Sequence, residues 1–420
     1  MNILKDIRFS YLLLAIAISS LFYGFYIDED SAGSGGFILD FNKTWNFVIS
    51  LKNEMNFLSD EYSIHTPLHY LILSQVLVLT ESQNLTRLIY FLGCFSIPFL
   101  FYLCLKLRYS RIKKINLIAI SSLLFFLPSF RSSIIWPNSS STALIFFLAF
   151  LYFFIVWNKK AKEQRIELNI EIFLQTFFLA LAVYTRQYYA YIYVFLIFVY
   201  LKNLKFKNFL IVCSFVFLLA LPGFYLVLAN PKLIVSFDLR FINTILVSSS
   251  IISFYLLPIY FLNFLHQKKL NDFFKKFSLN DSLPYFLIIF ISIVMISFFD
   301  YNYRIGGGFF LKLSRLIFEN NILFLITSII GLSICFNLIK EDKSNLFLIL
   351  IILLGFSYHM IFQKYFEPMF LFIYLFMINS EIKDNFIKNL NSVYILNLYF
   401  IIYLISAILN DTYKITNYLP

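Results

Sequence analysis

Charged residues are scarce in this chain. Asp, Glu, Lys and Arg together make up 14% of the 420 residues, hydrophobic residues make up 60%, and the mean hydropathy is +0.79. A soluble domain of this length could not hide so much apolar surface in one core, whereas lipid accepts apolar side chains on every helix. The composition therefore predicts an all-α, polytopic membrane protein.

Patterns that hold a metal or a phosphate by themselves are also missing. The four histidines do not cluster as zinc ligands, and Gly306-Gly307-Gly308 has no following Lys-Ser/Thr, so it is interpreted as an external turn. No metal site and no cofactor are expected, although the sequence leaves a need for a divalent ion open. The cysteines lie inside apolar runs without metal-like spacing, as small core residues: Cys94, Cys104, Cys213 and Cys335.

Apolar runs follow one another along almost the whole chain. We interpret about thirteen of them as membrane spans, several of which are shorter than a perpendicular helix needs. The first run lacks a clear cleavage site, so it is expected to be retained. No repeat, linker or appended soluble domain breaks the pattern, which predicts one polytopic domain over residues 1–420. The expected spans cover residues 9–27, 86–105, 114–129, 142–157, 169–184, 188–201, 208–228, 243–265, 283–299, 321–339, 346–362, 368–381 and 391–410.

The formal net charge of +11 is explained by topology rather than by nucleic acid. With a cytoplasmic N-terminus, most Lys and Arg fall in cytoplasmic loops, as the positive-inside rule requires. Residues 28–85 then form a first external loop, with helices near 42–51 and 67–80 lying at the outer interface. Counting 67–80 as a further span would place the most basic loop outside. The basic loops are residues 106–114, 159–165, 202–207 and 266–276.

The junction after the first span carries the clearest chemical signal. The apolar run 9–27 ends on three consecutive acids, Asp28, Glu29 and Asp30. A carboxylate at the mouth of a membrane span is costly unless it is solvated, paired or used, so it marks a candidate functional site. Single cations and polar groups fall on the same outer side, an arrangement suited to an anionic head group such as a lipid-linked phosphate. They include Arg131, Trp136, Arg186, Gln187, Asp238, Arg240, Arg304 and residues 363–368.

These pieces resemble the GT-C superfamily of membrane glycosyltransferases, in particular the branch with protein O-mannosyltransferases and lipid A aminoarabinose transferases. Asp28-Glu29 is similar to that branch's acid pair, residues 65–70 (His-Thr-Pro-Leu-His-Tyr) to its Pro-Pro-Leu-type segment, and Arg87-Leu88 to the Arg-Leu that opens its next span. Thr66 replaces the first Pro, and His65 stands where some relatives have Lys. The likeness covers roughly residues 1–200 in order, and the second half matches mainly in hydropathy. Arg186-Gln187 also resembles a feature of the lipid-linked oligosaccharide glucosyltransferases, and residues 364–368 (Lys-Tyr-Phe-Glu-Pro) are similar to a late external turn in related bacterial enzymes.

The resemblance implies a GT-C-like fold and transfer of a sugar from a polyprenyl-phosphate donor to a glycan or lipid-linked acceptor on the outer face. Such transfer needs a base near the acceptor hydroxyl and positive charge at the departing phosphate. Asp28 is the first choice for the base, with Glu29 and Asp30 as competitors, because partial desolvation at the bilayer edge raises carboxylate basicity. A planar guanidinium suits the phosphate. Residues expected to bind donor phosphate or substrate are Arg186, His65, Lys364, Arg304 and Gln187.

Two other functions stay open at this stage. A carrier or flippase for a lipid-linked saccharide would be expected to show repeat symmetry and polar residues near mid-membrane. An O-antigen-polymerase-like protein would carry its large external loop late in the chain. Here polar groups collect on one side and the large loop follows the first span, which favours an enzyme. The expected location is a bacterial inner membrane, with the lipid bilayer as a partner and no nucleic acid.

Overall fold

The computed structural model describes residues 2–32, 36–54, 65–163, 168–230, 240–266, 279–304, 306–356 and 360–413. These residues form helices and the segments that connect them, with no strand among them. The chain divides into two compact units, residues 11–235 and residues 1–10 with 236–420, and the first helix crosses the boundary. The single polytopic domain stays a prediction of the sequence.

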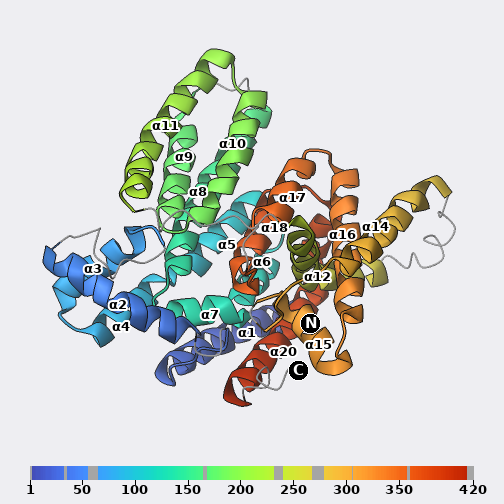
Figure 1. Ribbon diagram of the computed structural model, residues 1–420, viewed down its shortest axis with the longest axis horizontal. Helices are drawn as coiled ribbons and strands as arrows, with labels where there is room; N and C mark the ends of the chain where they lie inside the picture. Colours follow the sequence, from blue (N-terminus) through green and yellow to red (C-terminus); the bar gives the residue numbers. More distant parts are fainter. Residues whose placement is uncertain are drawn as a thin grey trace. The chain divides into compact units, whose positions relative to one another are not determined.

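The unit formed by residues 11–235 contains the first external loop of the predicted topology. Helices α8 to α11 run side by side in it, as the green part of Figure 1 shows, and α2 and α4 pack on α3. Its helices are α1 (Asn2–Tyr26), α2 (Gly36–Glu54), α3 (Leu68–Thr80), α4 (Gln83–Gly93), α5 (Ser96–Arg108), α6 (Lys114–Ser122), η1 (Leu123–Phe126), α7 (Pro128–Ile135), α8 (Ser139–Glu163), α9 (Ile170–Val183), η2 (Gln187–Tyr189), α10 (Ala190–Asn203) and α11 (Phe206–Ala229).

The second unit is built around α12 and α16. A Cβ at Gly331 of α16 would lie 1.8 Å from the carbonyl oxygen of Ser249 in α12, so only glycine lets these two backbones approach so closely. Ser328, one turn earlier, donates to the Leu246 carbonyl across the same contact at 2.9 Å. The helices of this unit are α12 (Phe241–His266), α14 (Leu279–Ser297), α15 (Gly308–Phe318), α16 (Ile322–Glu341), α17 (Asn345–Leu354), η4 (Gln363–Tyr365), α18 (Met369–Phe376), α19 (Glu381–Lys388) and α20 (Leu390–Tyr413).

Several helices turn large apolar side chains outward. On α11, Phe217 is 60% exposed, Phe224 58% and Leu228 82%, a surface that water would not stabilise but lipid does. Within the described residues, seven helices are long and apolar enough to cross a membrane, or eight if a pair bent by 67° is one span. The chain is therefore a polytopic, all-helical membrane protein. The seven are residues 8–26, 83–108, 139–160, 206–229, 241–265, 322–341 and 390–413.

The expected spans and interface helices can be compared with these elements. Every expected span overlaps at least one helix, but several of those helices, such as α9 and α17, are shorter than a perpendicular crossing needs. The larger span count therefore stays a prediction. The expected interface segments 42–51 and 67–80 are helical as α2 and α3. With 13 residues, α3 is too short to cross the hydrocarbon by itself.

One bend positions much of the candidate site. Lys114–Phe126 and α7 meet at 67°, at the turn that precedes Pro128. Proline at the first helical position lacks the amide that would be unsatisfied there and has a pre-set φ, so it starts a new helix direction. Arg131 follows one turn into α7, and its amide donates to the Leu127 carbonyl at 3.0 Å. The whole of α7 is buried.

Candidate functional site

The turn that ends α1 places Asp28 in an unusual backbone conformation. The amide of Asp28 donates to the Phe25 carbonyl at 3.4 Å, and the amide of Glu29 donates to the Gly24 carbonyl at 2.9 Å. This pair of bonds defines a Schellman motif with Asp28 at the left-handed position, where its φ is +58°. Glycine is the usual residue there, because a side chain in that conformation costs about 1–3 kcal/mol.

Asp28 is also at the unfavourable end of a helix for an acid. Carbonyl groups at a helix C-terminus carry partial negative charge, which repels a carboxylate. Arg87 of α4 offsets this repulsion: its Nη2 lies 2.5 Å from Oδ1 of Asp28. The Asp28 side chain is 58% exposed and that of Arg87 only 11%. Both the left-handed backbone conformation and the helix C-terminus disfavour an acid at position 28. Asp28 is nevertheless accessible, and it is paired with the nearly buried Arg87.

Arg87 is held by contacts on three sides. Its Nε donates to the Ile135 carbonyl at 2.8 Å, and its guanidinium carbon lies 3.7 Å from the Trp136 ring centroid and 4.8 Å from that of Phe25. Phe25 itself packs on Phe91, one turn after Arg87 on α4, with ring centroids 4.5 Å apart. This aromatic packing brings α4 against the end of α1 and places Arg87 opposite Asp28.

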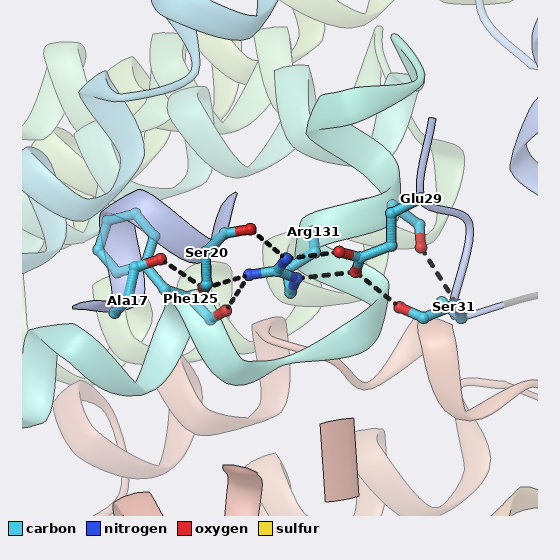
Figure 2. A network of polar contacts seen from close by, with 8 residues as sticks. Ala17, Ser20, Glu29, Ser31, Phe125 and Arg131 are labelled. Carbon is cyan, nitrogen blue, oxygen red and sulfur yellow. Dashed lines mark hydrogen bonds and ion pairs between the residues drawn. The ribbon is translucent and has the colours of Figure 1, made fainter. Parts of the chain in front are cut away.

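Glu29 makes a second ion pair, which the protein buries (Figure 2). Arg131 of α7 binds it through two parallel bonds, Nε to Oε1 at 2.8 Å and Nη2 to Oε2 at 2.5 Å. The side chains are 7% and 2% exposed. Ser31 donates to Oε1 of Glu29 at 3.0 Å. The fork-to-fork geometry is the strong form of an arginine–carboxylate contact.

Asp30 has a third and different environment. Its side chain is buried, and Oδ2 accepts hydrogen bonds from the amides of Phe37 and Ile38 at 2.8 and 3.0 Å. These amides belong to the first turn of α2, which has no intrahelical acceptors for them, so Asp30 caps that helix. Of the three consecutive acids, only Asp28 presents an accessible carboxylate. Glu29 and Asp30 are engaged in holding the turn and α2.

A second cation of the candidate site, Arg186, meets His65. Nη1 of Arg186 lies 2.8 Å from Nε2 of His65, and Nη2 donates to Oδ1 of Asn138 at 2.7 Å. The Arg186 residue is 6% exposed. The segment after His65 is fixed to the end of α9: the Thr66 hydroxyl donates to the Val183 carbonyl at 3.1 Å. The contact between Arg186 and His65 joins residues that are 121 positions apart in the sequence.

His69 extends this polar group toward α8. Its Nδ1 lies 2.8 Å from the Thr142 hydroxyl, which is also 3.0 Å from the Tyr90 hydroxyl. Tyr90 donates to the Asn138 carbonyl at 2.8 Å, so Asn138 contacts both Arg186 and Tyr90. Burial, reinforced by the positive charge of Arg186, lowers the pKa of His69 to about 3. The imidazole is therefore neutral at physiological pH.

The segment 135–138 connects the two arginines. Ile135 and Trp136 hold Arg87, and Asn138 holds Arg186. The pair of Asp28 with Arg87 and the pair of His65 with Arg186 thus contact the two ends of the same four residues, which run from the end of α7 to the residue before α8. Gln187, the first residue of η2, follows Arg186 directly and is half-buried.

The remaining expected binding residues, Lys364 and Arg304, belong to the other compact unit. Lys364 lies in η4, with its Nζ 5.2 Å from the Phe362 ring centroid. Arg304 is exposed. Beside Lys364, the buried Glu367 accepts a hydrogen bond from the Tyr255 hydroxyl at 2.7 Å. Their part in a common site with Asp28 stays a prediction.

The site also contains residues that were not among the expected site residues, namely Arg87, Arg131 and Asn138. Arg87 entered the sequence analysis only as part of an Arg-Leu likeness, and Arg131 only as one of several external cations. The sequence signal for Arg87 and Arg131 was that both are arginines in apolar surroundings. Such an arginine needs a partner, and the chain has few acids that could pair with it. Asn138 gave no signal.

Neither a metal-ligand cluster nor a comparison with known proteins gives information about the chemistry of the site. Among the described residues, no three His, Cys, Asp or Glu side chains gather as metal ligands would. No family model, curated protein or solved structure matches the chain. The chemistry of the site is therefore argued from its own residues.

The left-handed turn at Asp28 gives a first prediction. We expect Asp28→Gly to be more stable than Asp28→Val by about 1–3 kcal/mol, because both remove the carboxylate but only glycine adopts a positive φ without strain. The apparent thermal midpoint of the purified protein in detergent measures this difference. Equal midpoints, or a more stable valine variant, would contradict the assigned backbone conformation.

His69 gives a second prediction, on the pH dependence of stability. The folded protein keeps His69 neutral down to about pH 3, whereas the unfolded chain protonates it below about pH 6.5, so stability falls as the pH drops through that window. The slope from this one group is about 1.4 kcal/mol per pH unit. His69→Gln, which retains a hydrogen-bonding side chain, should have a shallower decline between pH 6 and 4.5, as followed by thermal midpoints. Identical declines would show that His69 charges in the folded state.

Proposed function

We propose that this protein is a GT-C-type membrane glycosyltransferase with thirteen spans, a cytoplasmic N-terminus and its active site on the outer face of a bacterial inner membrane. It transfers a sugar from a polyprenyl-phosphate donor to a glycan or lipid-linked acceptor. One observation carries the proposal: the accessible carboxylate of Asp28 ends the first span in a left-handed turn, 2.5 Å from Arg87. Stability alone does not favour an acid at such a position.

The reaction follows from the groups present. Asp28 accepts the proton of the acceptor hydroxyl while the oxygen of that hydroxyl forms a bond to the anomeric carbon of the donor sugar. The bond from that carbon to the phosphate oxygen breaks, and its electron pair leaves with the polyprenyl phosphate. A single displacement of this kind inverts the anomeric configuration. Phosphate is a good leaving group, so an acid to protonate it is dispensable.

Positive charge is needed where the phosphate leaves. Arg87 lies beside the proposed base and contacts one end of segment 135–138, and Arg186 contacts the other end. A guanidinium binds phosphate through two parallel bonds and keeps its charge at any relevant pH. Arg186 is engaged by His65 and Asn138, and in this proposal it also binds an oxygen of the donor phosphate. In this proposal Gln187, Lys364 and Arg304 assist in binding.

The role of Asp28 is tested by comparing acids in one loop. We expect Asp28→Asn to lower transfer about 10²–10⁴-fold, because a positioned base is lost while the shape of the side chain is kept. Glu54→Gln, at an exposed acid ending α2, is the matched control and should transfer normally. The measurement is the polyprenyl-linked sugar that accumulates in cells lacking the gene, and its disappearance when each variant is produced. Near-normal turnover by Asp28→Asn would refute the assignment of the base. If no lipid-linked sugar accumulates in the deletion strain, the transferase proposal itself fails.

The proposed orientation has its own test. Ser110, exposed between α5 and α6 in a basic loop, should be cytoplasmic, and Glu54 should be external. In a chain without other cysteines, an impermeant maleimide added to intact cells should label Glu54→Cys and spare Ser110→Cys. Permeabilised cells should show labelling at both positions. Labelling of Ser110→Cys in intact cells would reverse the topology.

A further inference from the structure

The guanidinium of Arg131 has all three of its nitrogens engaged. Besides the two bonds to Glu29, Nη1 donates to the Ser20 hydroxyl at 3.0 Å and to the Phe125 carbonyl at 3.1 Å, and Nη2 donates to the Ser20 carbonyl at 2.9 Å. These partners come from α1, from η1 and from the turn after α1 (Figure 2). Arg131 therefore ties the acid that follows Asp28 to two separate helices.

The backbone beside Asp28 is fixed from the same direction. The Glu29 amide donates to the Gly24 carbonyl, and its side chain is bound by Arg131, so Glu29 is held at both ends. Asp28 precedes it directly and has a positive φ. A sparsely populated backbone conformation persists where surrounding contacts hold it in place. The contacts of the Glu29 amide and side chain hold the positive φ of Asp28 in this way.

Gly24 makes room for the pair. A Cβ at this position would lie 2.4 Å from Oε2 of Glu29 and 2.8 Å from Nη2 of Arg131, distances at which the pair must move. Gly93, also within an apolar helical segment, has nothing within 4 Å of the corresponding point. The chain thus offers two Gly→Ala changes that differ in whether they disturb the ion pair.

We propose that Arg131, seated against Gly24, is the positioning residue that holds the Asp28 carboxylate toward Arg87. The role rests on the proposed function, because it concerns the presentation of the base. A buried ion pair contributes little net stability, since taking both charges out of water offsets their attraction. In this proposal the pair of Glu29 with Arg131 fixes the direction in which the neighbouring Asp28 side chain points. A small misplacement of a catalytic group lowers the rate by about 10²-fold.

The first test measures position without any reference to activity. Asp28→Cys and Arg87→Cys are combined in a chain whose native cysteines are replaced by alanine, and membranes are treated with a short bifunctional methanethiosulfonate. Because these changes remove the ion pair of Asp28 with Arg87, the cross-link yield reports how the rest of the turn holds residue 28. We expect Gly24→Ala and Arg131→Gln to lower the yield several-fold, and Gly93→Ala to leave it unchanged.

A graded series keeps this test informative if Arg131→Gln fails to accumulate. Arg131→Lys keeps the charge but loses the parallel bonds, and Ser20→Ala removes one partner of Nη1 while keeping the ion pair. Both should give intermediate yields, in that order of severity. Unchanged yields in Gly24→Ala and Arg131→Lys, accompanied only by lower thermal midpoints, would overturn positioning and leave a purely structural contact. An equal loss in Gly93→Ala would also overturn it.

The second test links position to turnover. In the chain that retains Asp28 and Arg87, Gly24→Ala should slow consumption of the accumulated lipid-linked sugar about 10²-fold, while Gly93→Ala should not. Unchanged turnover in Gly24→Ala, despite a lowered cross-link yield, would overturn the catalytic importance of the position. Failure of the proposed function is distinguishable, because no lipid-linked sugar would then accumulate in the deletion strain, while the cross-linking series would still respond to Gly24→Ala.

Discussion

The buried ion pair of Glu29 with Arg131 is the constraint on which the rest of the candidate site depends. It fixes Glu29, which lies between the exposed Asp28 and the helix-capping Asp30. Three consecutive acids of the same charge therefore have different roles. Neither charge could be buried alone, since breaking such a pair leaves an uncompensated ion at a cost of about 3–5 kcal/mol. The glycine of α1 that faces the pair and the proline that starts α7 are local requirements of the same contact.

Much of the architecture could be predicted because membrane spans leave a direct trace in sequence. Apolar runs mark the helices, and every expected span overlaps one or more of them. The short helix α3 was expected from its apolar run, and the charge of the basic loop 106–114 led to the expectation that it lies at the outer interface. The number of crossings was harder to predict, because broken helices such as α6 with α7 have the composition of one span and the geometry of two segments.

The candidate site could be predicted only in part. Three acids at the exit of a span were visible, but which of them is accessible depends on partners 59 and 102 positions away. No local pattern distinguishes Asp28 from Glu29, because the left-handed φ arises from the turn and from the contacts that follow it. The neutral state of His69 was likewise invisible, since it results from burial against Thr142 and the nearby charge of Arg186.

The stacking of Arg87 on Trp136 has an optical consequence. The indole ring lies 3.7 Å from a guanidinium, and only three tryptophans occur in the chain. An indole's emission depends on nearby charge, so any event that draws Arg87 away from the ring alters the fluorescence of this residue. Because Trp136 is two residues from Asn138, which holds Arg186, a ligand at either arginine perturbs the same short segment. If the proposed donor binds at these arginines, the fluorescence of Trp136 reports its binding.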